Sequence, residues 1–70
     1  MKVTDKDREF LMRYLNLQEQ DLEKLFGHLR SLPEDGDGSR EEYVEKLCEN
    51  LSGRDVYEIK KILLSRLFDE

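Results

Sequence analysis

Apolar side chains recur at spacings of three and four residues in four separate stretches of the chain, which is the pattern of amphipathic helices. The most regular stretch is the second, whose apolar residues are Leu22, Leu25, Phe26, Leu29 and Leu32. The periodicity predicts helices at about residues 5–15, 17–32, 40–51 and 54–68. We therefore expect an all-α fold, a single compact four-helix domain over residues 1–70 that is made of two helical hairpins.

A short polar residue followed three positions later by an acid stands at the start of each predicted helix. The four pairs are Thr4 with Asp7, Asn16 with Glu19, Ser39 with Glu42, and Ser52 with Asp55. Both side chains of such a pair can accept hydrogen bonds from backbone N–H groups that have no partner in the first helical turn. Between the second and third helices, a proline, two glycines and three acids over residues 33–38 predict the one long loop.

The last predicted helix carries two apolar seams. The first seam consists of Val56, Ile59, Leu63 and Leu67, and the second consists of Tyr57, Leu64 and Phe68. A helix with two apolar faces must contact two surfaces. Either this helix is the centre of the bundle and buries both seams, or the second seam stays partly exposed and binds a partner or a second copy of the chain.

Length and composition limit the classes of function. A chain of 70 residues has a small core, so a deep catalytic cleft or a cofactor cavity would remove packing that it needs. We accordingly expect a protein that is not an enzyme and binds no cofactor. No apolar run approaches the roughly 20 residues that span a bilayer, and the lone Cys48 cannot form an internal disulfide. These features predict a cytoplasmic protein without a membrane contact.

Negative charge is concentrated in one segment. The net charge is −5, and residues 34–49 hold seven acids but only two bases, Arg40 and Lys46, so this segment accounts for the whole excess. Such a potential attracts a basic protein and disfavours direct binding to nucleic acid or anionic lipid. Alternatively, the acids only keep the surface solvated and favour the dipole of the third helix.

Candidate sites for chemistry are few. The loop string resembles an EF-hand calcium loop, but placing Gly38 at its sixth position puts Val44 at the twelfth, where a glutamate belongs. Placing Gly36 there leaves Ser31 and Pro33 at ligand positions. His28 borders the apolar stripe of the second helix, and Cys48 lies on the inward face of the third. The sequence therefore predicts neither a metal site nor catalytic residues.

Two short stretches resemble known families. Ser39, at the head of an acidic helix, is similar to the attachment serine of acyl carrier proteins, although Arg40 stands where that family has an apolar residue. The resemblance implies a carrier domain modified at Ser39. The stretch from Asp21 through His28 to the acidic loop is similar in rhythm to part of the immunity proteins of colicin nucleases. Their aromatic pair followed by proline is missing, since Tyr43 stands alone. That resemblance implies an inhibitor of a basic enzyme.

The first expectation for function is a small acidic protein–protein interaction or regulatory module that binds a partner with a basic surface. The candidate partner-binding residues are Asp35, Asp37, Glu41, Glu45, Glu49, Tyr57, Leu64 and Phe68. A homodimer through the last helix is a further alternative. The rival functions are a stoichiometric inhibitor of a basic enzyme such as a nuclease, a carrier domain, and a designed helical protein without a biological role.

Overall fold

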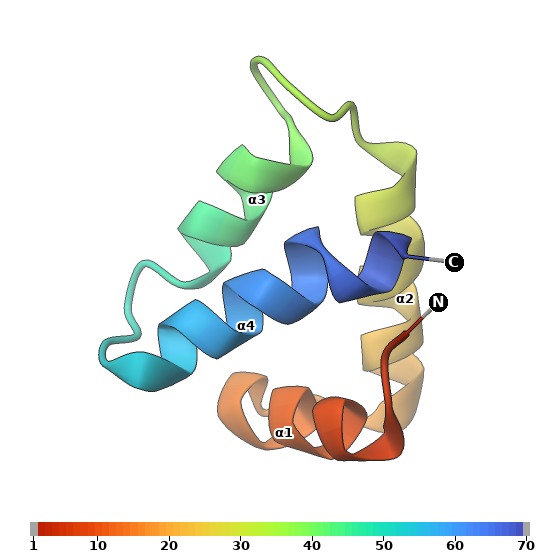
Figure 1. The fold of residues 1–70 in the computed structure, drawn as a ribbon, viewed down its shortest axis with the longest axis vertical. Coiled ribbons are helices and arrows are strands. Elements are labelled where there is room, and N and C mark those ends of the chain that lie inside the picture. Colours follow the sequence, from red (N-terminus) through yellow and green to blue (C-terminus); the bar gives the residue numbers. More distant parts are fainter. Residues whose placement is uncertain (1, 70) are drawn as a thin grey trace.

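The computed structural model describes residues 2–69, which form four α-helices and one short 3₁₀ helix (Figure 1). The elements are α1 (Asp5–Leu15), α2 (Glu19–Ser31), α3 (Arg40–Leu47), α4 (Arg54–Leu64) and the 3₁₀ helix η1 (Arg66–Phe68). The expected all-α four-helix fold is thus confirmed.

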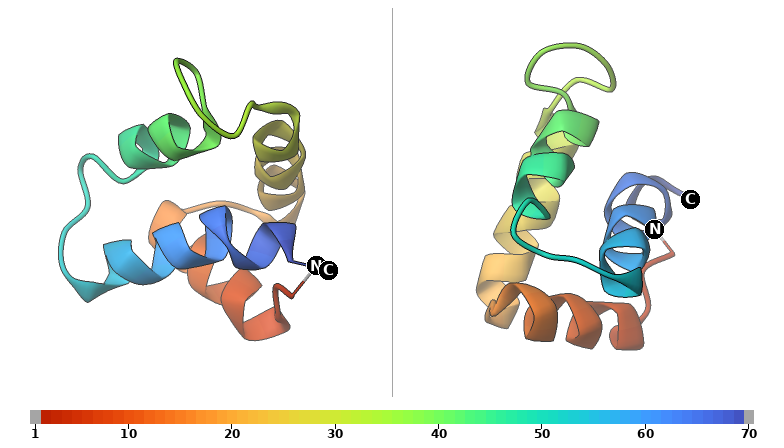
Figure 2. Two further views of the ribbon diagram at one scale, coloured as in Figure 1. Left: turned by 45° about the horizontal axis from the view of Figure 1, so that its top comes forward. Right: turned by 90° about the vertical axis from the view of Figure 1, so that its left-hand side faces the viewer.

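Three sides of the molecule are formed by α1, α2 and α3. In Figure 1, α1 lies along the bottom, α2 stands at the right and α3 lies at the upper left, while α4 crosses the middle. The right-hand view of Figure 2 shows α2 and α3 in one layer, α4 facing them across the molecule, and α1 beneath both. This arrangement places α4 where it can pack against helices of both pairs.

The hydrophobic core is centred on α4. Its residues Ile59, Ile62 and Leu63 are completely buried, and Leu67 of η1 is nearly so. The expected first seam omitted Ile62. The other core residues come from the three remaining helices and the residue after α3, and they are Leu11, Leu22, Leu25, Phe26, Leu29, Val44 and Cys48. The burial of its side chains therefore agrees with the expected central position of the last helix.

The start of α1 follows the sequence pattern, but the start of α2 does not. The Asp7 N–H donates to the Thr4 hydroxyl, and the Thr4 N–H donates to the Asp7 carboxylate. Asn16, by contrast, is the C-cap of α1 with a left-handed φ of 55°. Asparagine tolerates this conformation well, so the expected N-cap role of Asn16 was wrong. Instead, α2 begins at Glu19 after the N-cap residue Gln18.

Two corrections concern the connection between α3 and α4. Ser39 caps α3 as expected, accepting a hydrogen bond from the Glu42 N–H at 3.2 Å. The helix ends at Leu47, however, four residues earlier than expected, because the chain then forms turns, in which the Glu49 N–H donates to the Lys46 carbonyl and the Leu51 N–H to the Cys48 carbonyl. Ser52 does not cap α4. The N-cap residue is Gly53, whose φ of 89° and ψ of −167° lie in a region that essentially only glycine occupies.

The last helix is also shorter than expected. It ends at Leu64, and Ser65 leaves helical geometry with φ −125° and ψ −67° before η1 begins. The carbonyl of Arg66 then accepts a hydrogen bond from the Lys2 N–H at 3.1 Å, which joins the two ends of the described chain. Because Phe68 lies on η1, it is not on the same helical face as Tyr57 and Leu64. The expected second seam is therefore not one continuous helical stripe.

Candidate functional site

Six carboxylates of the acidic segment form no ion pair within residues 2–69, and we call these six the acidic surface. They are Glu34, Asp35, Asp37, Glu41, Glu45 and Glu49, and all are exposed. The seventh acid, Glu42, lies 3.5 Å from the ammonium nitrogen of Lys46. Within residues 2–69, none of the six has a Lys, Arg or His partner at ion-pair distance. The negative charge that the sequence concentrates here therefore remains largely unneutralised.

The second base of the segment is engaged elsewhere. The guanidinium of Arg40 lies over the ring of Phe68 with 4.0 Å between its central carbon and the ring centroid. This cation–π contact covers one side of Phe68 and links the start of α3 to η1. Arg40 thus stabilises the packing of η1 and forms no ion pair with the acidic surface.

The structure separates the three apolar candidates for partner binding. Leu64 is half-buried in a shallow recess of about 200 Å³, which is also lined by Glu34, Asp35, Arg40 and Glu41. Phe68 is half-buried under Arg40, whereas Tyr57 is 74% exposed and lines no part of that recess. Leu64 therefore lies beside members of the acidic surface, and Tyr57 stands apart from it.

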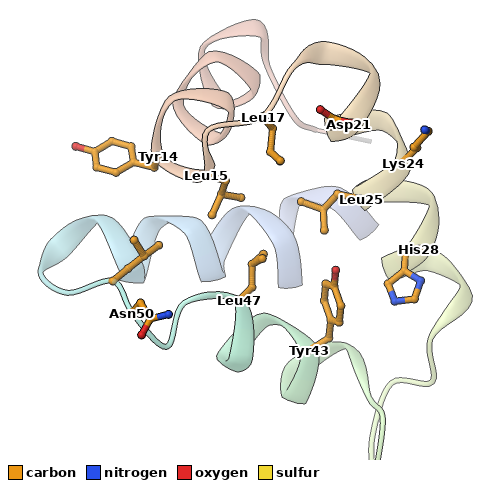
Figure 3. Close-up of a pocket in the computed structure, with 11 residues that line it drawn as sticks. Tyr14, Leu15, Leu17, Asp21, Lys24, Leu25, His28, Tyr43, Leu47 and Asn50 are labelled. Carbon is orange, nitrogen blue, oxygen red and sulfur yellow. The ribbon is translucent and has the colours of Figure 1, made fainter.

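A groove of about 570 Å³ is the feature that sequence reasoning missed (Figure 3). It is bounded by the end of α1, the turn that follows, α2, α3 and the connection to α4. Its lining residues are Tyr14, Leu15, Leu17, Asp21, Lys24, Leu25, His28, Tyr43, Leu47, Asn50 and Leu51. Five leucines make it mostly apolar. One residue gave a signal of the groove. Leu17 is an apolar residue in a turn, and an apolar side chain at such a position is explained only by the packing of several segments around it.

Aromatic residues mark the two ends of this groove. At the end nearest the loop, the rings of His28 and Tyr43 meet edge to face with centroids 4.8 Å apart, which joins α2 to α3. At the other end, a hydrogen bond to the Asp55 carboxylate and its negative charge raise the pKa of Tyr14 above the ordinary tyrosine value. The rim between them carries one acid and one base, Asp21 and Lys24. The groove itself is therefore close to neutral and suits apolar groups.

The groups that could carry covalent chemistry are poorly placed for it. Cys48 is 4% exposed, and burial raises the pKa of its thiol, so little reactive thiolate is present at neutral pH. The Ser39 hydroxyl is also buried and already accepts the Glu42 N–H, which weighs against its modification as a carrier serine. Among the described residues, no three metal-ligating side chains come together. No helix in the same range has the length and apolar character needed to cross a membrane.

Comparison of the chain with protein-family models, with curated proteins and with solved structures gives no match.

Proposed function

We propose that this protein is a non-catalytic interaction module whose acidic surface binds a basic face of a protein partner. The observation that carries the proposal is that the six carboxylates of the acidic surface have no ion-pair partner among residues 2–69. Exposed ion pairs add little to the stability of an isolated protein, so surface carboxylates can stay unpaired at low cost, and they then create a field that attracts an oppositely charged surface.

The local arrangement leaves most of this field in place. Lys46 pairs with the seventh acid, Glu42, so the six carboxylates of the acidic surface are opposed within residues 34–49 only by Arg40, which keeps its charge while it lies against Phe68. Glu41 and Glu45 are one helical turn apart on the exposed side of α3. Complementary charge of this kind mainly accelerates association and selects the partner, and salt weakens it.

The test begins with affinity capture, using the tagged protein as bait in an extract of its source cells. Each captured protein is then purified and its dissociation constant is measured at low and high ionic strength. We expect a basic partner, and we expect the variant Glu41→Lys/Glu45→Lys/Glu49→Lys to bind it at least about tenfold more weakly with a flatter salt dependence. The matched control Asp5→Lys/Glu9→Lys/Asp69→Lys changes charge equally at exposed acids outside the acidic surface and should bind almost as the parent does.

Two outcomes would decide against the proposal: a captured partner without a basic face, or equal binding by the charge-reversed variant and its control. If the partner is an enzyme, its activity is measured in the equimolar mixture. Loss of activity would identify the protein as an inhibitor that acts through the same surface, whereas retained activity would identify an adaptor.

A further inference from the structure

We propose that the groove binds an amphipathic helix of the partner, with apolar side chains in the groove and Lys or Arg side chains against the loop carboxylates Asp35 and Asp37. This inference deepens the proposed function and rests on it. It adds a second contact surface and states which kind of segment the partner must contribute.

The dimensions of the groove fit a short stretch of helix. On one wall, α2 contributes Asp21, Leu25 and His28, which are spaced by four and three residues. On the opposite wall, α3 contributes Tyr43 and Leu47, also one turn apart. The seven residue steps from Asp21 to His28 rise by about 10 Å, which is two helical turns. A partner helix can therefore place two or three apolar side chains, at spacings of three and four, between these walls.

The apolar lining is available for such side chains. Leu15, Leu17, Leu47 and Leu51 are only half-buried although all four line the groove and contact the core. Figure 3 shows leucine side chains from several segments directed toward the space between α2 and α3. Burying these side chains under a partner removes apolar surface from water, which is the main source of affinity at a small site.

Charge selects the sequence of the partner helix. Inside the groove, Asp21 and Lys24 offset each other. Beyond the contact of His28 with Tyr43, the chain enters the loop over residues 33–38, which contains three acids and no base. A helix that lies in the groove and continues past this end approaches a loop whose three carboxylates outnumber the nearby guanidinium of Arg40. Basic residues beyond its apolar positions are therefore favoured, and acidic residues are disfavoured.

A second copy of this chain does not fit these features. Two copies, each with a net charge of −5, repel one another. A basic helix from a different protein does not meet this difficulty, because its charge is opposite to that of the loop carboxylates.

The probe for the test is a phage-displayed library of random peptides of about 16 residues, roughly four helical turns, selected on the purified protein. We expect enriched peptides to carry apolar residues at spacings of three and four, followed by Lys or Arg. Their affinities are measured with synthetic peptides by fluorescence anisotropy. We expect Lys24→Trp, which places a bulky side chain at the rim, to weaken binding about tenfold or more. The matched control Lys61→Trp makes the same change at an exposed position of α4 and should leave affinity unchanged.

The contribution of the loop is tested separately with the variant Asp35→Asn/Asp37→Asn, which should bind the peptides more weakly and with a smaller salt dependence. The control variant Asp5→Asn/Glu9→Gln should bind them as the parent does. Urea unfolding confirms that each variant is folded. Enriched peptides without basic residues, or affinities insensitive to Lys24→Trp, would overturn the inference. So would a selection that enriches nothing, or a groove that binds a small apolar dye but no peptide. If the natural partner responds to charge reversal on α3 but not to Lys24→Trp, the proposed function stands and the groove inference fails.

Discussion

Two regions of this small protein use charged side chains in opposite ways. In the first, Arg66 contacts the carboxylates of Asp7 at 2.8 Å and Glu58 at 3.2 Å, and Arg8 forms an ion pair with Glu23. These contacts join η1 to α1 and α1 to α2, and we call the region the ion-paired end. In the acidic surface, six carboxylates have no such partner within residues 2–69. Charge therefore joins segments of the fold at one end and stays unpaired within residues 2–69 at the other, which is the surface that we propose for a partner.

Sequence distance explains why the paired charges matter more for folding. Asp7 and Arg66 are 59 residues apart, so their contact fixes the two ends of the chain relative to each other. Asp7 is also well shielded, with 13% of its side chain exposed. The acidic surface lies on one short helix and its flanking segments, so its carboxylates do not join segments that are distant in the sequence. Neutralising charge should therefore have unequal effects in the two regions.

The largest expected effect comes from the core that both regions share. Leu63 of α4 is fully buried, and Leu63→Ala should lower the free energy of unfolding by about 2–5 kcal/mol, because it removes buried apolar atoms and leaves a cavity. Urea unfolding followed by circular dichroism measures this loss. The control Lys61→Ala changes an exposed residue of the same helix and should stay within about 0.5 kcal/mol of the parent. A loss below about 1 kcal/mol for Leu63→Ala would show that α4 is not the packing centre.

The next largest effect is expected when a charge of the ion-paired end is removed. Asp7→Asn keeps the shape of the side chain but removes the charge that faces Arg66, and it weakens the capping of α1. The expected loss is about 1–2 kcal/mol in the free energy of unfolding. Glu9→Gln, on an exposed acid of the same helix, serves as the control and should change stability by less than about 0.5 kcal/mol. Equal results for the two variants would remove the distinction between the regions.

Local signals in the sequence were sufficient for some features of the fold. Thr4 and Ser39 are each followed by an acid at the third position, and both cap a helix as expected. Asn16 and Ser52 have the same pattern but are not the N-caps of α2 and α4. The capping motif alone does not determine which residue is the N-cap. A residue can instead end the preceding helix in a left-handed conformation, or a neighbouring glycine can take the N-cap position. The geometry at these junctions depends on how neighbouring helices pack.

Only one of the two parts of the candidate site could be predicted from the sequence, for a related reason. The acidic surface is contiguous in the chain, so counting charges over residues 34–49 found it. The groove is assembled from residues as distant as Tyr14 and Leu51, and its volume depends on the angles between helices. Periodicity assigns each leucine to an apolar face but does not tell which part of that face the other helices leave uncovered.

A smaller, pH-dependent effect should arise where α1 meets the start of α4. The Asp55 carboxylate raises the pKa of Tyr14 in the folded protein by hydrogen bonding and by charge. Since the unfolded chain keeps the ordinary value near 10, this contact stabilises the fold below about pH 10 and the contribution is lost as pH rises through the raised value. Urea midpoints at about pH 8 and about pH 11 should therefore differ more for the parent than for Asp55→Asn. If the difference between the two midpoints is the same for the parent and for Asp55→Asn, Asp55 does not interact with the phenol of Tyr14 in the folded protein.

The smallest expected effect tests the acidic surface itself. Glu45 lies one helical turn after Glu41 on α3, so Glu45→Gln relieves repulsion and should raise the free energy of unfolding by about 0.2–0.5 kcal/mol. Glu42→Gln makes the same chemical change on the same helix, but it removes the ion pair with Lys46 and weakens the bond from the Gly38 N–H, because an amide oxygen accepts less strongly than a carboxylate. A small loss is therefore expected. Both are measured by urea unfolding at low salt, where screening is weakest. A loss of more than about 1 kcal/mol for Glu45→Gln would mean that this carboxylate stabilises the fold and is not held free for a partner.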